Sequence, residues 1–411
     1  MFFVKENDMA LSKVLYFDHN ATTPLDPSVF ESMTPYFVER FGNSVSAHPL
    51  GWDADAASQA ARAQISSLLN CQARELTFTS GATESNNWIL QSFCADFLKN
   101  NPNDSLQLIG SPVEHNSVMK CLEHLATHPR IKVQWAEVDR YGSVKVESVK
   151  KLIGPTTHLM SFMWANNETG SINPISELAQ IATESGIAFH CDATQAVGKI
   201  EVDLEKTQID FLTFSAHKFY GPKGIGCTYI NGKKVKSAPT PLLFGGGHER
   251  GLRAGTMNVP AIVGMGAASV IAKDRLLADQ DRWMSLRSLL CEKIIEHFPT
   301  AVFNTPLENS VPNTLNLSFV GHSVPANIPG VAVSKGSACS SSGVHQSHVL
   351  KAIGLSSEMA SATLRISLGR MTSEDDLNQL VELLVKSIQV RSNGPSRVAS
   401  HDQPDQTHSI C

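Results

Sequence analysis

The segment Ile209–Ile230 reads IDFLTFSAHKFYGPKGIGCTYI and holds two short apolar runs on either side of a turn that contains glycine and proline. Runs of this length, rich in aromatic and β-branched residues and bounded by turn residues, are typical of buried β-strands. Lys218 directly follows the first run, where a surface charge is poorly placed. The segment therefore predicts two core strands with a lysine at the end of the first.

Runs of the same kind recur earlier in the chain, with helical stretches between them. They are ELTFTS (75–80), LQLIGS (106–111), HLMSFMWA (158–165) and IAFHCDA (187–193). Strands that alternate with helices predict a largely parallel sheet with helices covering it, which is an α/β fold.

The character of the sequence changes near residue 260. A long helical stretch from Pro260 is followed by more helix and by two strand-like runs, NTLNLSF (313–319) and TLRISLG (363–369). A last helix is expected from TSEDDL, with Thr372 and Asp375 as a capping box. We expect three parts: a large domain over 17–260, a smaller α+β domain over 1–16 and 261–390, and a polar tail over 391–411.

The composition is that of an ordinary globular chain. Its 411 residues are 42% hydrophobic and 18% charged, with a formal net charge of −5 and no long basic run. Nucleic acid and anionic membranes are therefore not expected partners. The first residues, MFFVKENDMALSK, resemble neither a signal nor a transit peptide, and no apolar run reaches the ~18 residues of a membrane span. We expect a cytoplasmic location.

The eight cysteines are scattered and include no CxxC pair, which favours reduced, structural thiols. The nearest zinc candidates, His190–Cys191 and the pair of His345 and His348, are weak, and no metal is expected. Cys339 differs from the other cysteines because its neighbours in SKGSACSSSG are small and polar and offer no apolar core.

A glycine turn in FTSGATESNN (78–87) follows the first strand-like run. It leads from Gly81 into a helix that is expected to begin near Thr83. Backbone N–H groups and the positive end of the helix dipole make such a turn suitable for a phosphate. An N-cap by Ser80 or Thr83 is the alternative interpretation.

Two charged residues follow later strands. Asp192, in FHCDATQAVG (189–198), is placed where a buried carboxylate needs a partner, such as the protonated nitrogen of a pyridine ring. A helix N-cap is the alternative. Lys218 is placed to form a Schiff base with a carbonyl compound, the alternative being an ion pair with a carboxylate.

A glycine-rich loop, FGGGHERGLRAGT (244–256), carries Arg250, Arg253 and Thr256. It could bind a phosphate in its own subunit, reach a neighbouring subunit, or simply be flexible. In chain order, the phosphate turn, the ring-nitrogen acid and the strand-end lysine describe a site for pyridoxal 5′-phosphate (PLP). A dinucleotide site is not expected, because no GxGxxG follows an early strand.

The chain resembles the cysteine desulfurases of the NifS/IscS group, which are class V aminotransferase-like, fold-type I PLP enzymes. The matching motifs lie between about residues 14 and 390: YFDHNATTPLDP (16–27), FGNSVSAH (41–48), FTSGATESNN, VEHNSV (113–118), MWANNETG (163–170), DATQAVGK (192–199), SAHKFYGPKGIG (215–226), GGGHERGLRAGT, GSAC (336–339) and RISLGR (365–370). The resemblance implies a fold-type I PLP-dependent transferase, with a large α/β domain and a smaller α+β domain.

The resemblance also implies a role for each matching residue. Lys218 would bind the cofactor covalently, His115 would stack on its ring and move protons, and Cys339 would receive the sulfur. Cofactor binding would fall to Ala82, Thr83, Ser215 and His217 at the phosphate, Asp192 at the ring nitrogen, Gln195 and Asn167 at the ring hydroxyl, and Thr256 at the phosphate of a second subunit. Arg365, assisted by Asn167, would bind the carboxylate of L-cysteine; for Arg365 a salt bridge between domains is the alternative.

The reaction implied is the conversion of L-cysteine to L-alanine with a persulfide on Cys339, whose small-residue loop would give the thiol mobility. The enzyme would be a homodimer that passes sulfur to an acceptor protein, such as an iron–sulfur scaffold. The segment VGHSVPANIPG (320–330) is shorter than its counterpart in the family and carries two prolines, so no regular helix is expected there. Lys335 stands where serine is common, and its ammonium could lower the pKa of the Cys339 thiol.

Three other activities remain open from the sequence: a selenocysteine lyase with the same cofactor chemistry, a true class V aminotransferase, and a weakly active sulfur-delivery partner. The first would favour selenocysteine as substrate. The second would require a keto acid and would not need Cys339. The third would bind PLP without turnover.

Overall fold

The computed structural model describes residues 14–236, 238–335 and 347–390. Its largest element is a seven-stranded sheet in which only β8 runs against its neighbours. In spatial order the strands are β2 (Leu76–Thr79), β8 (Gly226–Ile230), β7 (Phe211–Ser215), β6 (Ala188–Asp192), β5 (Thr157–Met163), β3 (Leu106–Gly110) and β4 (Ile131–Trp135). The mainly parallel α/β sheet expected from the sequence is confirmed.

Helices cover both faces of this sheet, because successive strand side chains point to opposite faces. Leu108 of β3 belongs to a cluster with α5 and α6, whereas the next residue, Ile109, belongs to a cluster with α7 and α8. Strands buried on both faces are apolar along their whole length, as the sequence runs are. The covering helices are α4 (Pro49–Leu69), α5 (Ala82–Asn100), α6 (Asn116–Leu125), α7 (Val146–Leu152) and α8 (Ile175–Glu184).

A second core lies around a three-stranded antiparallel sheet in the order β13 (Thr363–Ser367), β10 (Thr314–Phe319) and β9 (Ala301–Phe303). Two short strand pairs join β1 (Leu15–Tyr16) to β12 (Val331–Ala332) and β11 (His322–Ser323) to β14 (Gln389–Val390). The other helices are α2 (Pro27–Met33), α3 (Pro35–Val38), α10 (His348–Ala352), α11 (Ser357–Ser361) and α12 (Glu374–Ser387), with short 3₁₀ turns η1 (Ala73–Glu75), η2 (Ala216–Lys218) and η3 (His248–Gly251).

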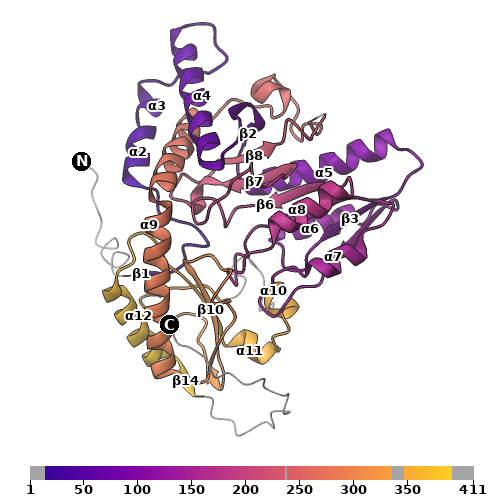
Figure 1. Cartoon of the computed structure of the whole chain (residues 1–411). Helices are drawn as coiled ribbons and strands as arrows, with labels where there is room; N and C mark the ends of the chain where they lie inside the picture. Colours follow the sequence, from indigo (N-terminus) through magenta and orange to yellow (C-terminus); the bar gives the residue numbers. More distant parts are fainter. Residues whose placement is uncertain (1–13, 237, 336–346, 391–411) are drawn as a thin grey trace.

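The longest helix, α9 (Val259–His297), runs along the molecule from α2 to α12 and takes part in both cores (Figure 1). Near its start, Ile262 and Met265 pack with the large sheet, and towards its end Trp283 and Leu290 pack with the small one. Helix α9 thus connects the two cores without a break. The division of the chain at residue 260 stays a prediction.

One expected helix boundary is wrong by one residue. The N-cap of α12 is Ser373, whose hydroxyl accepts from the backbone N–H of Asp376 (3.2 Å), while the Asp376 carboxylate accepts from the N–H of Ser373 (2.7 Å). Thr372, expected to hold this position, instead accepts from the N–H of Gly369 and closes the preceding turn. The expectation that residues 320–330 form no regular helix is confirmed.

No helix of the described segments is long and apolar enough to cross a membrane.

Candidate active site

A cavity of about 530 Å³ lies at the carboxyl ends of the parallel strands. An α/β sheet binds its ligands at this edge, because the loops that follow the strands converge there. Ten of the twelve residues expected at the site line the cavity: Ala82, Thr83, His115, Asn167, Asp192, Gln195, Ser215, His217, Lys218 and Arg365. The other two are Thr256, which does not line the cavity, and Cys339, which lies outside the described residues.

The first turn of α5 forms one wall of the cavity. The helix begins at Ala82, one residue before the expected start, and its N-cap, Gly81, provides no side chain to cap the first N–H groups. A Cβ placed on Gly226 of the neighbouring strand would lie 2.5 Å from the Cα of Gly81, so the two backbones are in close contact there. The open N-terminus and the adjacent Ser215 and His217 form a site suited to a phosphate.

Asp192, the last residue of β6, is only 4% exposed. Its Oδ2 accepts from Nδ2 of Asn86 on α5 (2.8 Å), and its Oδ1 accepts from the backbone N–H of Thr194 (3.0 Å). These bonds orient the carboxylate without neutralising its charge, since neither partner is a cation. A protonated ring nitrogen is a cation that can pair with this carboxylate.

Lys218 ends η2, directly after β7. Its Nζ donates to the backbone oxygens of Asn20 and Ala21, both at 2.7 Å. The carbonyl of Asn20 also accepts from Nε2 of Gln195 (2.9 Å). The segment after β1 thus holds the lysine and one of the expected ring contacts in place.

Two histidines of the cavity are neutral at pH 7 because burial lowers their pKa. For His217 the pKa falls to about 4, with the nearby Lys218 adding to the effect of burial. For His115 burial is again the largest cause, and the negative charge of Asp192 partly offsets it. His115 caps α6, and its Nδ1 accepts from the backbone N–H of Ser117 (3.2 Å), which leaves the proton of the neutral ring on Nε2.

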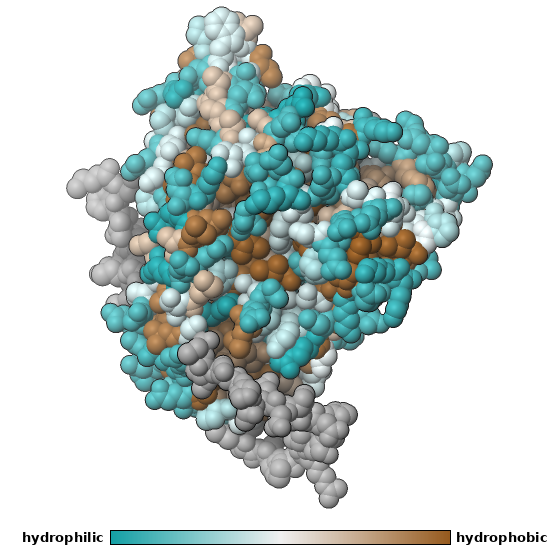
Figure 2. Space-filling model, in the orientation of Figure 1, coloured by the Kyte–Doolittle hydropathy of each residue, from teal (hydrophilic) through white to brown (hydrophobic). Residues whose placement is uncertain are grey.

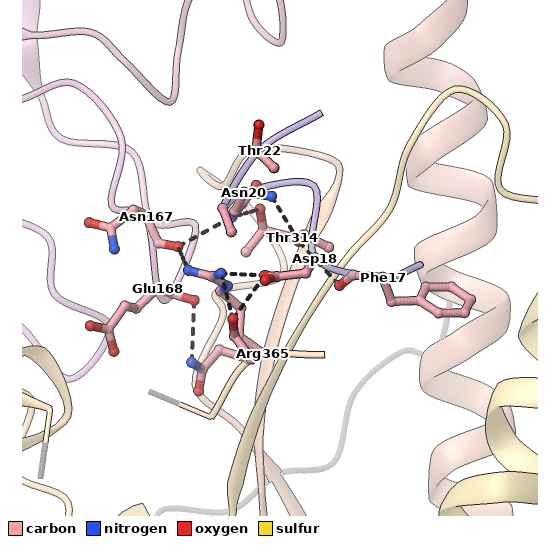
Figure 3. A network of polar contacts seen from close by, with 12 residues as sticks. Phe17, Asp18, Asn20, Thr22, Asn167, Glu168, Thr314 and Arg365 are labelled. Carbon is pink, nitrogen blue, oxygen red and sulfur yellow. Dashed lines mark hydrogen bonds and ion pairs between the residues drawn. The ribbon is translucent and has the colours of Figure 1, made fainter. Parts of the chain in front are cut away.

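Arg365 lies on β13, in the small sheet, and reaches across to the loop after β5 (Figure 3). Its Nη1 donates to the backbone oxygen of Asn167 (2.9 Å), and its Nη2 donates to Oδ1 of Asp18 (2.5 Å) and to Oγ of Ser334 (2.9 Å). Its Nε has no hydrogen-bond partner within the described part of the chain. Arg365 therefore forms the ion pair that was the alternative interpretation, with Asp18 as its partner. Arg365 also lines the cavity.

The residues around the cavity fit PLP. An uncapped helix start suits the phosphate, Asp192 suits the ring nitrogen, and the amine of Lys218 suits the aldehyde carbon. Three buried polar atoms of lining residues, Asn167 Oδ1, Thr194 Oγ1 and Arg365 Nε, have no partner among the described residues. Buried polar groups are normally hydrogen-bonded, so these atoms match a polar ligand.

The glycine-rich loop, residues 244–256, contributes nothing to the cavity of its own chain. Arg253 pairs with Glu84 of α5 (2.9 Å), and Nη2 of Arg250 donates to the backbone oxygen of Leu76 (2.8 Å). Thr256 is exposed and does not line the cavity. Of the interpretations left open for this loop, binding of a phosphate in the same subunit finds no support in this geometry.

Cys339 lies outside the described residues, as does His345. The Lys335 ammonium donates to the backbone oxygens of Val324 (2.5 Å) and Ser361 (3.3 Å), and burial lowers its pKa. Its expected effect on the Cys339 thiol stays a prediction. In residues 14–236, 238–335 and 347–390, no group of three or more His, Cys, Asp or Glu side chains could hold a metal ion.

Sequence reasoning missed several residues that contribute to the site. Asn20 and Glu168 line the cavity, Asp18 pairs with Arg365, and Lys199 binds Gln195. All four lie inside motifs that resemble the family's, but their roles depend on contacts between segments 150 or more residues apart, or on burial. For Lys199 the sequence signal is its position four residues after Gln195 in the same motif.

Comparison with known proteins agrees with this geometry. The Aminotransferase class-V family matches residues 15–380. The cysteine desulfurase IscS of Neisseria gonorrhoeae is 41% identical over 384 residues, which is 92% of this chain and 93% of the relative. A solved NifS-like protein superposes with a TM-score of 0.82 at 37% identity, covering 91% of this chain and 98% of its own.

A second solved structure, SspA in complex with cysteine, has a TM-score of 0.75 at 33% identity, covering 86% of this chain and 98% of its own. The matches with IscS and with the NifS-like protein span nearly the whole chain and include both sheets. The chain therefore belongs to the class-V aminotransferase family, in its NifS/IscS group of cysteine desulfurases.

Proposed function

We propose that this chain converts L-cysteine to L-alanine with PLP as its cofactor and transfers the sulfur to Cys339. The observation that carries the proposal is the convergence of ten expected site residues, from both sheets, on one cavity. The match with cysteine desulfurases over nine-tenths of the chain supports the same reaction.

The residues of the cavity would divide the work between cofactor and substrate. The first turn of α5, with Ser215 and His217, would hold the phosphate, and Asp192 would hold the ring nitrogen in its protonated form. When bound, the cofactor supplies an electron sink for the pair of electrons left at the substrate α-carbon. Neutral His115 can take up and return a proton, and the Arg365 guanidinium binds the substrate carboxylate.

The overall reaction balances without an added oxidant. The C–S bond of L-cysteine breaks, an S–S bond forms at Cys339, and the proton of the Cys339 thiol ends on the β-carbon of alanine. The sulfur is oxidised as the β-carbon is reduced. A protein thiol could then accept the sulfur from the persulfide and deliver it to iron–sulfur or other sulfur-containing cofactors.

Release of alanine and sulfide from L-cysteine, in the presence of a reductant, tests the proposal. Wild type should show a visible cofactor band that borohydride abolishes, and should turn over. Cys339→Ala should keep the band and lose the turnover, while Cys291→Ala, a described cysteine remote from the cavity, should keep both. A Cys339→Ala variant with wild-type turnover would contradict the role of Cys339.

The same assay separates the other candidate activities. A much faster rate on selenocysteine than on cysteine would indicate a selenocysteine lyase. A stoichiometric need for a keto acid would indicate an aminotransferase. A cofactor band without turnover in any condition would indicate a sulfur-delivery partner.

A second copy of this chain is the partner that the surface favours. Apolar side chains reach the surface at the end of the molecule that contains α3 and α4 (Figure 2). Five of them, here called the α3–α4 patch, are more than half exposed: Phe37, Val38, Phe41, Val45 and Trp52. Patches of this kind mark interaction sites.

The glycine-rich loop ends beside this patch, since Met257 packs with Tyr36 of α3 and Ala54 of α4. A copy bound there would bring its own exposed Thr256 near the interface. This supports a homodimer in which Thr256 reaches the phosphate of the second subunit. A cytoplasmic location and an iron–sulfur scaffold as acceptor stay predictions.

A further inference from the structure

Lys199 is a lysine buried in the large domain, only 2% exposed. Its Nζ donates to Oε1 of Gln195 (2.5 Å) and to Oδ1 of Asn20 (2.8 Å). Both acceptors are neutral amides, and no carboxylate within the described residues lies within ion-pair distance of this ammonium. Burial of a lysine without a counter-charge costs stability, so a lysine at this position points to a role in the site.

The hydrogen bonds leave only one orientation for each amide. Backbone carbonyls only accept, so the amide nitrogen of Gln195 must face the carbonyl of Asn20 (2.9 Å). For the same reason the amide nitrogen of Asn20 faces the carbonyl of Asn167 (3.3 Å). Both amide oxygens are then turned towards Lys199, which donates to each.

We propose that Lys199 is a positioning residue that fixes the Gln195 amide with its N–H group towards the cofactor. This inference rests on the proposed function. Because Gln195 lines the cavity, its second N–H is free to face the ring hydroxyl oxygen and to stabilise that oxygen when it is ionised. The role does not depend on the protonation state of Lys199, because a neutral amine also donates two hydrogen bonds.

Electrostatics support the same assignment. Burial is the largest cause that lowers the pKa of Lys199, and the positive charges of Lys218 and Arg365 lower it further. Lys218 binds the carbonyl of Asn20 and Lys199 binds its side chain, while Asn20 and Arg365 both donate to the carbonyl of Asn167. A positive charge on Lys199 would therefore stabilise an ionised ring oxygen, as the Gln195 N–H would.

The test is a pH titration of the visible cofactor band in the absence of substrate. Lys199→Met keeps an unbranched side chain that ends before the position of Nζ, removes the donor and also removes the desolvation cost, so the protein should fold. The midpoint of the titration should rise by about one to two pH units, because a hydrogen bond to a charged group is worth ~1.5–3 kcal/mol. The dissociation constant for PLP should rise about tenfold. Lys206→Met, at an exposed lysine far from the cavity, should change neither.

A double-mutant cycle shows whether Lys199 acts through Gln195. On a Gln195→Ala background, Lys199→Met should move the midpoint little further. A full additional shift would overturn the proposal, as would a Lys199→Met midpoint equal to that of wild type. If Lys199→Met fails to fold, Lys199→Gln, which keeps an amide donor, takes its place in the test. Its titration midpoint should lie between those of wild type and Gln195→Ala. A midpoint at or beyond that of Gln195→Ala would overturn the proposal.

The proposed function fails in a different way. Wild type without any visible band in the presence of PLP would remove the cofactor site itself, and the role of Lys199 with it. If wild type shows a normal band and Lys199→Met has the same titration midpoint, only the proposed role of Lys199 is contradicted, and the cofactor site stands.

Discussion

Arg365 already has a carboxylate partner inside the protein, Asp18 (Figure 3). Both protons of Nη2 are used, one by Asp18 and one by Ser334, and one proton of Nη1 is used by Asn167. A substrate carboxylate that binds the guanidinium through two parallel hydrogen bonds must therefore replace one of the Nη2 partners. If Arg365 binds the substrate in this way, the substrate carboxylate takes the place of either the Asp18 carboxylate or the Ser334 hydroxyl at Nη2.

Replacement of Arg365 by lysine should affect binding more than chemistry. A lysine ammonium is a point charge and cannot form the two parallel hydrogen bonds that a planar guanidinium makes with a carboxylate. We expect Arg365→Lys to raise the KM for L-cysteine about 10- to 100-fold, the equivalent of one charged hydrogen bond, with a smaller change in kcat. Steady-state kinetics measure both. Arg275→Lys, on the exposed side of α9, is the matched control. An unchanged KM in Arg365→Lys would exclude it as the carboxylate site.

Glu114, next to His115, is completely buried, and burial raises its pKa to about 8, with the charge of Asp192 adding to the effect. Its Oε1 accepts from Ser111 Oγ (2.6 Å) and from the N–H of Met163 (3.1 Å). A carboxyl group with a raised pKa in the folded state stabilises the fold below its unfolded pKa. That contribution is lost as the pH rises from about 4.5 to about 8.

Glu114→Gln should remove this loss of stability. The amide is isosteric with the protonated carboxyl and can keep both accepted hydrogen bonds. We expect the Tm of the variant to exceed that of wild type by a margin that is smallest near pH 4.5 and grows up to about pH 8. Differential scanning calorimetry across this range measures it, and comparison of the two proteins cancels the opposite effect of the buried histidines. A constant difference at all pH values would contradict a titrating Glu114.

Among the elements, the glycine-rich loop is held by a buried ion pair. Glu249 of η3 pairs with Arg62 of α4 (2.6 Å), and its second oxygen accepts from the N–H of Phe78 on β2 (2.7 Å). The backbone of Glu249 has a φ of 49°, a left-handed conformation that costs energy in any residue except glycine. The ion pair ties the loop to α4, and the hydrogen bond to Phe78 ties it to β2.

Removal of one partner of this pair should destabilise the protein strongly. Glu249→Ala leaves the Arg62 guanidinium buried without its counter-charge, and such losses are about 3–5 kcal/mol. Urea titration followed by circular dichroism measures the change. Arg62→Met combined with Glu249→Ala should recover part of the loss, because no charge is then left buried. If the double variant were less stable than Glu249→Ala, desolvation would not be the cause.

The strands were predictable because those of the main sheet are buried on both faces and therefore stand out as apolar runs. Gly81, Asp192 and Lys218 were predictable because each directly follows such a run, and strand ends converge in this class of sheet. The partners of these residues were not predictable. Asn20 lies 198 residues from Lys218 and Asp18 lies 347 residues from Arg365, so only the folded topology brings them together. The start of α12 was misplaced because Thr372 and Ser373 both fit an N-cap.

At the scale of the whole molecule, the site combines residues from two cores, and the proposed dimer would complete it from a second copy. Arg365 comes from the small sheet and Lys218 from the large one, and α9 takes part in both cores. Thr256 remains outside the cavity of its own chain. The proposed dimer places the α3–α4 patch and this loop at one interface, so that the cofactor site is complete only in the pair.

Subunit mixing distinguishes a Thr256 that acts across the dimer from one that acts within its own chain. Thr256→Val should weaken PLP binding about tenfold by removing one hydrogen bond to the phosphate, and Lys218→Ala should abolish covalent binding. In a mixed dimer of the two variants, one site has an intact Lys218 and receives Thr256 from the Lys218→Ala subunit. That site should bind PLP with wild-type affinity, measured by titration of the visible band after purification with two different tags. If every site in the mixed dimer binds as weakly as Thr256→Val alone, Thr256 does not act across the interface.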